Sequence, residues 1–267
     1  MNADALRAGL EGAVNFRDFG GCPAGPGRRV RAGMLYRSAQ LSELTAEDYE
    51  TLDSIGVRTI CDLRSARERE RLPTRPPEAW GAQILHLDVL GDPGAGARDF
   101  WAKVADDPTE AGVHRAMIEN YRGMPARFAR ALPQALDLLL DPDGPPVLIH
   151  CHAGKDRTGF ACAMILFALG VEEGTIRDDY LRTLASADAI AGQSMIATAA
   201  ERRLGFRLEP AACSMIETVR PDYLDAALAA VRADHGSTSA YLERVGRLDE
   251  GKRSRLRARL LVVPGEG

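Results

Sequence analysis

A cysteine and an arginine six residues apart carry the clearest chemical signal in the sequence. Cys151 and Arg157 lie within residues 150–159, which read HCHAGKDRTG, after an apolar strand-like stretch at 146–149 and before an apolar helical stretch at 158–169. A loop that runs from a strand into a helix turns its backbone N–H groups inward, and the helix dipole adds to the positive field. The segment is therefore suited to a cysteine thiolate and to a bound phosphate.

This spacing predicts phosphoryl transfer in two steps. Cys151 would attack phosphorus in line, and water would then hydrolyse the cysteinyl-phosphate. The planar fork of Arg157 and the loop amides would stabilise the equatorial oxygens, and the hydroxyl of Thr158 would stabilise the thiolate or assist its departure. The expected phosphate-binding residues are His152, Ala153, Gly154, Lys155, Asp156 and Arg157.

Two histidines flank the cysteine and raise the alternative of a metal site. His150 and His152 have no second cluster of ligands elsewhere in the sequence, so we expect neither a metal nor another cofactor. His150 is instead expected to orient the loop through hydrogen bonds.

The same segment resembles the signature of the protein tyrosine phosphatases, His-Cys-x5-Arg-Ser/Thr. The residues Ala153–Gly159 of this signature are similar to those of tyrosine-phosphatase family 3, a group of bacterial enzymes with tyrosine and often lipid phosphatase activity. Further stretches that look like this family follow in order along the chain: Asn15–Gly21, Leu35–Ser38, Asp62–Ser65, Asp179–Leu181 and Arg220–Leu224. The resemblance implies a metal-independent phosphomonoesterase that acts on phosphotyrosine, with phosphoserine, phosphothreonine and phosphoinositides as further substrates.

The general acid has two candidates. Neither Trp80 nor Trp101 begins the Trp-Pro-Asp loop of classical tyrosine phosphatases, and Asp222 lies where Pro221 indicates a helix start. The resemblance implies that Asp156, inside the loop, is the acid, although an aspartate in a turn can also be purely structural. Asp62, at the end of the strand expected at 57–61, is the second candidate.

The loop also carries a second cation. Lys155 would favour substrates with more than one phosphate, or it is a solvated lysine beside an acidic partner. Arg64 and Arg37 would add to the same positive field.

Five cysteines without paired spacing do not form a disulfide framework, and a catalytic thiolate needs a reducing compartment. Cys61 has two interpretations. It is either a buried strand residue or the partner of Cys151 in a reversible disulfide that protects the nucleophile.

The composition limits the partners. A chain of 267 residues that is 45% hydrophobic fits a single phosphatase domain over residues 1–267, and a net charge of −4 argues against nucleic acid. We see no signal peptide and no apolar stretch long enough to span a bilayer, so a cytoplasmic location is the default, with non-classical export left open. The expected partner is a phosphorylated protein or a phosphoinositide, and the oligomeric state stays undetermined.

The pattern of elements predicts an α/β fold, with a central mixed sheet of four to five strands flanked by helices. We expect short strands within 15–38, a helix that Thr45 opens and that closes before Gly56, and buried strands at 57–63 and 83–89. Residues 91–108 are expected to form a loop, and helices are expected at about 110–121 and 125–140. By resemblance this is the cysteine-dependent phosphatase fold.

Two helical stretches remain ambiguous. The resemblance implies that residues 172–218 form a helical lid inserted in this fold, and ordinary packed helices are the alternative. The basic run at 252–259 is expected to be a solvated helix face, with contact to a membrane surface as the alternative.

Two other functions would use a similar loop. A phosphate-binding pseudophosphatase would bind without turnover, although Cys151, Asp156, Arg157 and Thr158 are all intact. A rhodanese-type sulfurtransferase also uses a cysteine in an anion-binding loop, but that loop lacks the continuation Gly154–Gly159.

Overall fold

The computed structural model describes residues 9–89, 95–192 and 196–264. A five-stranded sheet lies at its centre, in the order β1-β3-β6-β4-β5. The strands are β1 (Arg17–Asp18), β3 (Leu35–Ser38), β6 (Val147–His150), β4 (Thr59–Asp62) and β5 (Gln83–His86). Four run parallel and β1 runs antiparallel to β3, so the predicted mixed α/β sheet is confirmed.

The three inner strands are short apolar runs that are buried on both faces. Alternate side chains face opposite layers: Leu148 and Ile60 face a small cluster with α2 (Ala46–Ser54), whereas Ile149 faces the main core. β5 differs from the expected buried strand. It ends at His86 and its side chains are partly exposed, because it is the edge strand with only one neighbour.

The helices of the sheet layer begin where the sequence provides caps. Thr45 and Asp48 form a capping box at the start of α2, and Ser65 and Glu68 form another at α3 (Ala66–Arg71). α8 (Asp156–Leu169) lies against the sheet and ends at Gly170, whose φ of +86° terminates it.

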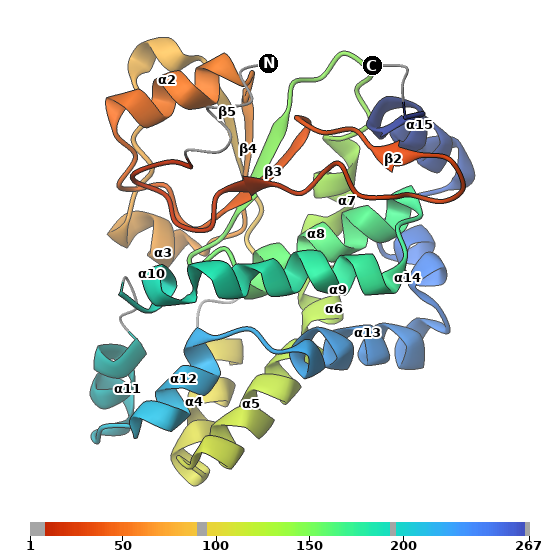
Figure 1. The fold of residues 1–267 in the computed structure, drawn as a ribbon. Helices are drawn as coiled ribbons and strands as arrows, with labels where there is room; N and C mark the ends of the chain where they lie inside the picture. Colours follow the sequence, from red (N-terminus) through yellow and green to blue (C-terminus); the bar gives the residue numbers. More distant parts are fainter. Residues whose placement is uncertain (1–8, 90–94, 193–195, 265–267) are drawn as a thin grey trace.

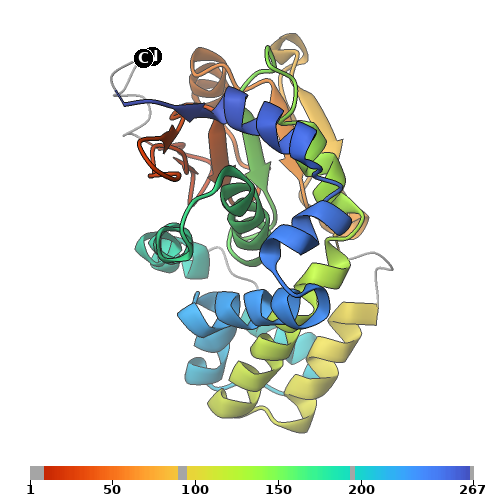
Figure 2. The same ribbon diagram turned by 90° about the vertical axis from the view of Figure 1, so that its right-hand side faces the viewer.

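The remaining helices lie partly beside the sheet, against α8, and partly in a group below the sheet in Figure 1 and Figure 2. They are α4 (Ala95–Asp106), α5 (Glu110–Arg122), α6 (Met124–Arg127), α7 (Ala131–Asp137), α9 (Glu173–Leu181), α10 (Ala187–Gly192), α11 (Ile196–Leu204), α12 (Pro210–Glu217), α13 (Pro221–His235), α14 (Thr238–Arg244) and α15 (Glu250–Leu260), with short 3-10 turns at Glu78–Trp80 and Arg182–Ser186. The helix expected at 125–140 is therefore two short helices.

Two expectations for these helices need correction. Within the expected loop at 91–108, residues 95–106 form α4, because Phe100, Trp101 and Val104 give it an apolar side that packs on the core, and residues 91–94 lie outside the described residues. The basic run in α15 is a solvated face only in part, since Arg255 is exposed but Arg253 and Arg259 are buried, as are Leu256 and Leu260. α15 packs on α8. The short strand that follows it, β7 (Leu261–Val262), pairs antiparallel with β2 (Arg29–Val30).

The described parts of the segment 172–218, residues 172–192 and 196–218, are mainly helical, as the sequence predicts. α9 packs along α8 and α12 packs along α5.

Candidate active site

Cys151 follows β6 directly, at the carboxyl edge of the three inner strands, and α8 begins five residues later at Asp156. Its side chain is buried. Gly154 has a φ of +64°, and a Cβ there would lie 2.4 Å from the Ser38 carbonyl oxygen. Only glycine therefore allows the loop to pass so close to the end of β3.

The N-terminal segment holds this loop in place. The side chains of Asn15 and Arg37 both donate to the Gly154 carbonyl oxygen, each at 2.9 Å. Arg37 and Arg17 also pair with Asp179 of α9, at 2.7 and 3.3 Å. Two of the sequence stretches that point to the family thus meet at one carbonyl of the loop, and a third, through Asp179, holds the arginines of the first two.

Arg157 is paired with a residue that the sequence analysis did not identify. Glu68 accepts hydrogen bonds from both terminal nitrogens of Arg157, at 2.8 and 2.7 Å, and the Leu63 carbonyl accepts from Nη1 at 3.3 Å. A guanidinium has five N–H donors, so Nε and one hydrogen of Nη2 remain. These two donors share one edge of the guanidinium and suit two oxygens of a phosphate.

The same carboxylate also caps α3. Ser65 donates to Glu68 from its backbone N–H and from its hydroxyl, at 2.8 and 2.9 Å. Burial opposes ionisation of Glu68, but Arg157 outweighs this effect and lowers the pKa of Glu68 to about 2. The capping pattern Ser65-x-x-Glu68 is the signal that could have drawn attention to this residue.

Asp156 is the first residue of α8, and about a quarter of its side chain is exposed. The buried hydroxyl of Tyr121 donates to its carboxylate at 2.5 Å and lies 2.7 Å from the hydroxyl of Tyr180. Burial, with Asp156 next in effect, raises the pKa of both tyrosines, so the hydroxyls keep their protons. Asp156 is thus oriented by a neutral donor and keeps an exposed edge.

Lys155 lies almost fully buried beside the loop. Its ammonium donates to the carbonyl of Ile216 and, at 3.2 Å, to that of Thr218, and it lies 3.4 Å from Asp156. In this arrangement the lysine ties the loop to the end of α12.

Asp62 and Arg64, the supporting residues at the next strand, bind each other. Two hydrogen bonds between their side chains, of 2.9 and 2.8 Å, and a third of 3.0 Å from the Arg64 backbone N–H join them, and the Asp62 side chain is fully buried. Burial would raise the pKa of Asp62, but Arg64 outweighs it and lowers that pKa. A buried, paired carboxylate cannot reach a leaving group, which disfavours Asp62 as the acid.

The remaining loop residues are also buried or nearly so. His150 lies with Nδ1 3.1 Å from the Cys151 carbonyl oxygen, and burial lowers its pKa to about 4, so the ring is neutral at pH 7. Burial lowers the pKa of His152 as well. Among the described residues, the buried hydroxyl of Thr158 has no hydrogen-bond partner, which leaves it available to the thiolate.

Cys61 does not lie opposite the nucleophile. Its partner across the sheet is Ile149, two residues before Cys151. With strands about 4.8 Å apart and a rise of about 3.3 Å per residue, the two Cα atoms are roughly 8 Å apart. A disulfide spans at most about 7 Å between Cα atoms. Burial also raises the pKa of the Cys61 thiol, so we interpret it as a core residue.

The described residues, 9–89, 95–192 and 196–264, contain neither a cluster of metal ligands nor a membrane-spanning helix. Within these ranges, no cluster of three or more histidine, cysteine or acidic side chains is placed to hold a metal ion. None of the helices in the described ranges has the length and apolarity needed to span a bilayer.

A family model described as a tyrosine phosphatase family matches residues 8–262. A tyrosine-protein phosphatase of Cupriavidus necator is 36% identical over 85% of this chain and 80% of its own. The triple specificity protein phosphatase PtpB of Mycobacterium tuberculosis is 32% identical over 94% of this chain and 98% of its own. A crystal structure of P. aeruginosa TpbA gives a TM-score of 0.29 at 17% identity, covering 67% of this chain and 91% of that one, which is too low to support an argument.

Proposed function

Because this chain belongs to the tyrosine phosphatase family, we propose that it hydrolyses phosphotyrosine through a cysteinyl-phosphate formed on Cys151. The strongest support is the position of Cys151 at a buried strand end, in a loop that returns through Gly154 to the N-terminus of α8. Six residues further on, Arg157 presents the free edge of its guanidinium.

In the first step, the Cys151 thiolate attacks phosphorus while Arg157 and the amides of residues 152–157 hold the equatorial oxygens. Glu68 fixes the plane of the guanidinium, and Thr158 donates its free hydroxyl to the sulfur. The tyrosine oxygen leaves from the side opposite the sulfur.

Asp156 protonates that leaving oxygen and then accepts a proton from the water that hydrolyses the cysteinyl-phosphate. Its exposed edge and its hydrogen bond from Tyr121 support this role. Asp62, which is buried and paired with Arg64, has neither property.

In the proposed function, the described residues of the segment 172–218, which are 172–192 and 196–218, cover this loop as a lid. Lys155 bonds to two carbonyls of the segment, and the ring of Tyr180 packs against Gly159. Leu184 and Phe206, two large apolar side chains of the segment, are exposed and suit contact with an aromatic substrate.

The substrate range extends to phosphoserine, phosphothreonine and phosphoinositides. The support is the triple specificity in the name of the relative that shares 32% of its residues over 94% of this chain. Since the thiolate must stay reduced, the enzyme acts in a reducing compartment such as the cytoplasm. A panel of phosphopeptides and phosphoinositides, run with a chelator present, measures this range.

The test of the proposal is Cys151→Ser. We expect hydrolysis of a phosphotyrosine peptide to fall by at least about 10⁴-fold, because serine is a far weaker nucleophile in a loop built for a thiolate. Vanadate should still bind to the variant. Retained turnover would refute the nucleophile, and loss of both turnover and vanadate binding would show a collapsed loop.

A further inference from the structure

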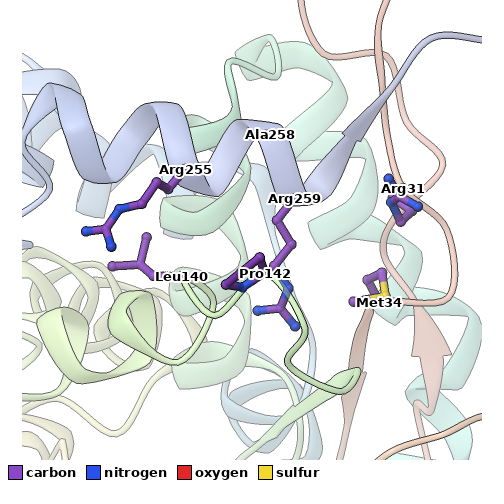
Figure 3. Close-up of a pocket in the computed structure, with 7 residues that line it drawn as sticks. All are labelled: Arg31, Met34, Leu140, Pro142, Arg255, Ala258 and Arg259. Carbon is purple, nitrogen blue, oxygen red and sulfur yellow. The ribbon is translucent and has the colours of Figure 1, made fainter.

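A second concave surface lies at the opposite end of the sheet from Cys151. Its larger hollow, of about 460 Å³, is lined by Arg31, Met34, Leu140, Pro142, Arg255, Ala258 and Arg259 (Figure 3). Met34 precedes β3 and Pro142 precedes β6, whereas the Cys151 loop follows β6. The hollow is thus separated from the phosphatase loop by the length of the inner strands.

A smaller hollow of about 290 Å³ adjoins it and shares Arg31 and Ala258. Its further lining includes Arg28 and Arg257. Five arginines therefore surround two neighbouring hollows in a chain whose net charge is −4. No carboxylate is among the lining side chains within the described ranges.

Most of this charge is uncompensated. Arg28, Arg31, Arg255 and Arg257 have no ion pair in the part of the chain that the structure describes, and Arg28, Arg31 and Arg255 are exposed. Gathering like charges opposes folding unless an anion offsets their repulsion. Unpaired guanidinium groups around a hollow are the arrangement that binds phosphate groups.

The backbone beneath these arginines is fixed in place. β2 and β7 pair with each other, and the Arg31 N–H donates to the Leu260 carbonyl oxygen at 2.7 Å. Arg259 is largely buried and donates to the carbonyl oxygens of Gly144 and Pro145 at 2.7 and 3.0 Å. Both walls of the larger hollow are therefore held in place without a ligand.

We infer that these two hollows form a binding site for a compound with at least two phosphate groups, one group in each hollow and Arg31 between them. The apolar side chains of Met34, Leu140 and Pro142 would contact an uncharged ring or chain of the ligand. A ring that carries at least two phosphate groups is found both in free polyphosphorylated inositols and in phosphoinositide headgroups. The inference does not depend on the reaction proposed for Cys151.

The experiment measures binding to the full-length chain with vanadate present to occupy the Cys151 loop. One arm titrates inositol hexakisphosphate by calorimetry, and the other measures sedimentation with phosphatidylcholine vesicles with or without phosphatidylinositol bisphosphate. The test variant is Arg31→Glu with Arg255→Glu. The matched control is Arg122→Glu with Arg130→Glu, which makes the same charge change at exposed arginines of α5 and the turn after α6.

We expect the test variant to bind inositol hexakisphosphate at least about tenfold more weakly than the wild type and the control, since two charge-assisted contacts are lost. Hydrolysis of a phosphotyrosine peptide should be unchanged, which separates this site from the catalytic one. Equal binding by test variant and control would overturn the proposal, as would no binding of either probe by the wild type. Specific vesicle binding that is lost in the same variant would support the proposal and identify the lipid headgroup as the source.

If the double variant does not fold, Arg31→Gln and Arg255→Gln, each alone, replace it. Each removes one charge from an exposed side chain, so each should weaken binding without unfolding the chain. Unchanged binding in both would overturn the inference.

Discussion

At the carboxyl ends of the parallel strands, the arginines meet carboxylates, whereas the arginines that line the two hollows at the opposite end of the sheet form no ion pair within the described residues. The first group consists of the pairs Arg157–Glu68, Arg64–Asp62 and Arg37–Asp179. The second group includes Arg31 and Arg255, which are exposed.

Each end of the sheet is suited to a different task. A paired, buried guanidinium has one position, so its remaining donors are aimed before a substrate arrives, which favours catalysis. An unpaired, exposed guanidinium keeps all its donors for a ligand and contributes little to folding. The comparison can therefore be tested by removing partners at one end and charges at the other.

The largest effect is expected for Asp179→Asn. The variant leaves the fully buried Arg37 without its carboxylate, and breaking such a pair costs about 3 kcal/mol in the free energy of unfolding. Arg255→Gln, at the other end of the sheet, should change the free energy of unfolding by less than about 0.5 kcal/mol. Urea denaturation of both variants measures this contrast. Similar losses of stability in the two variants would contradict it.

Acid should lower the stability of the protein through His150, which lies at the end of the sheet where the arginines are paired. Burial lowers the pKa of His150 to about 4, so below pH 6.5 the unfolded chain binds the proton before the folded chain does. The free energy of unfolding should therefore fall by about 3 kcal/mol as the pH drops from 6.5 to 4. The pKa values of Glu68 and Asp62 are lowered, so their ion pairs persist in this range.

The measurement is urea denaturation across that range for the wild type and for His150→Asn. The free energy of unfolding should depend less steeply on pH in the variant than in the wild type. If the two proteins show the same pH dependence, His150 is not the group responsible.

Glu68→Gln should reduce turnover on the order of 10²-fold, because a misplaced Arg157 loses contact with the transition state. The control is Ser65→Ala, which weakens the same helix cap by about 1 kcal/mol but leaves Arg157 paired. Steady-state kinetics on a phosphotyrosine peptide compares the two variants. Equal losses of turnover would show that Glu68 acts only by capping α3.

The smallest effect is expected for Tyr121→Phe, which removes the hydrogen bond to Asp156. Turnover should fall by about tenfold for poor leaving groups and hardly at all for good ones, since only the former need the acid. Tyr223→Phe is the control, because its hydroxyl bonds to the Met215 carbonyl instead. The same loss for good and poor leaving groups would contradict the role of Asp156.

Local features were predictable because they depend on neighbours in the sequence. The strand before Cys151, the helix after it, the capping box at Thr45 and the proline that starts α13 at Pro221 all follow from propensity and spacing over a few residues. The edge position of β5 and the helix α4 did not follow, because they depend on which elements lie beside them.

The segment proposed to carry the nucleophile and to bind phosphate could be recognised from the sequence, because its strand, loop and helix are formed by neighbouring residues. The alternation of strands and helices likewise predicted a mixed α/β sheet. Which partner each charged group takes could not be predicted, because it depends on packing between distant elements. Arg157 meets Glu68 across 89 residues, Arg37 meets Asp179 across 142, and Lys155 reaches carbonyls at the end of α12. Long cationic side chains have many local partners available, and packing between distant elements selects one of them. The same packing left the arginines that line the two hollows without an ion pair among the described residues.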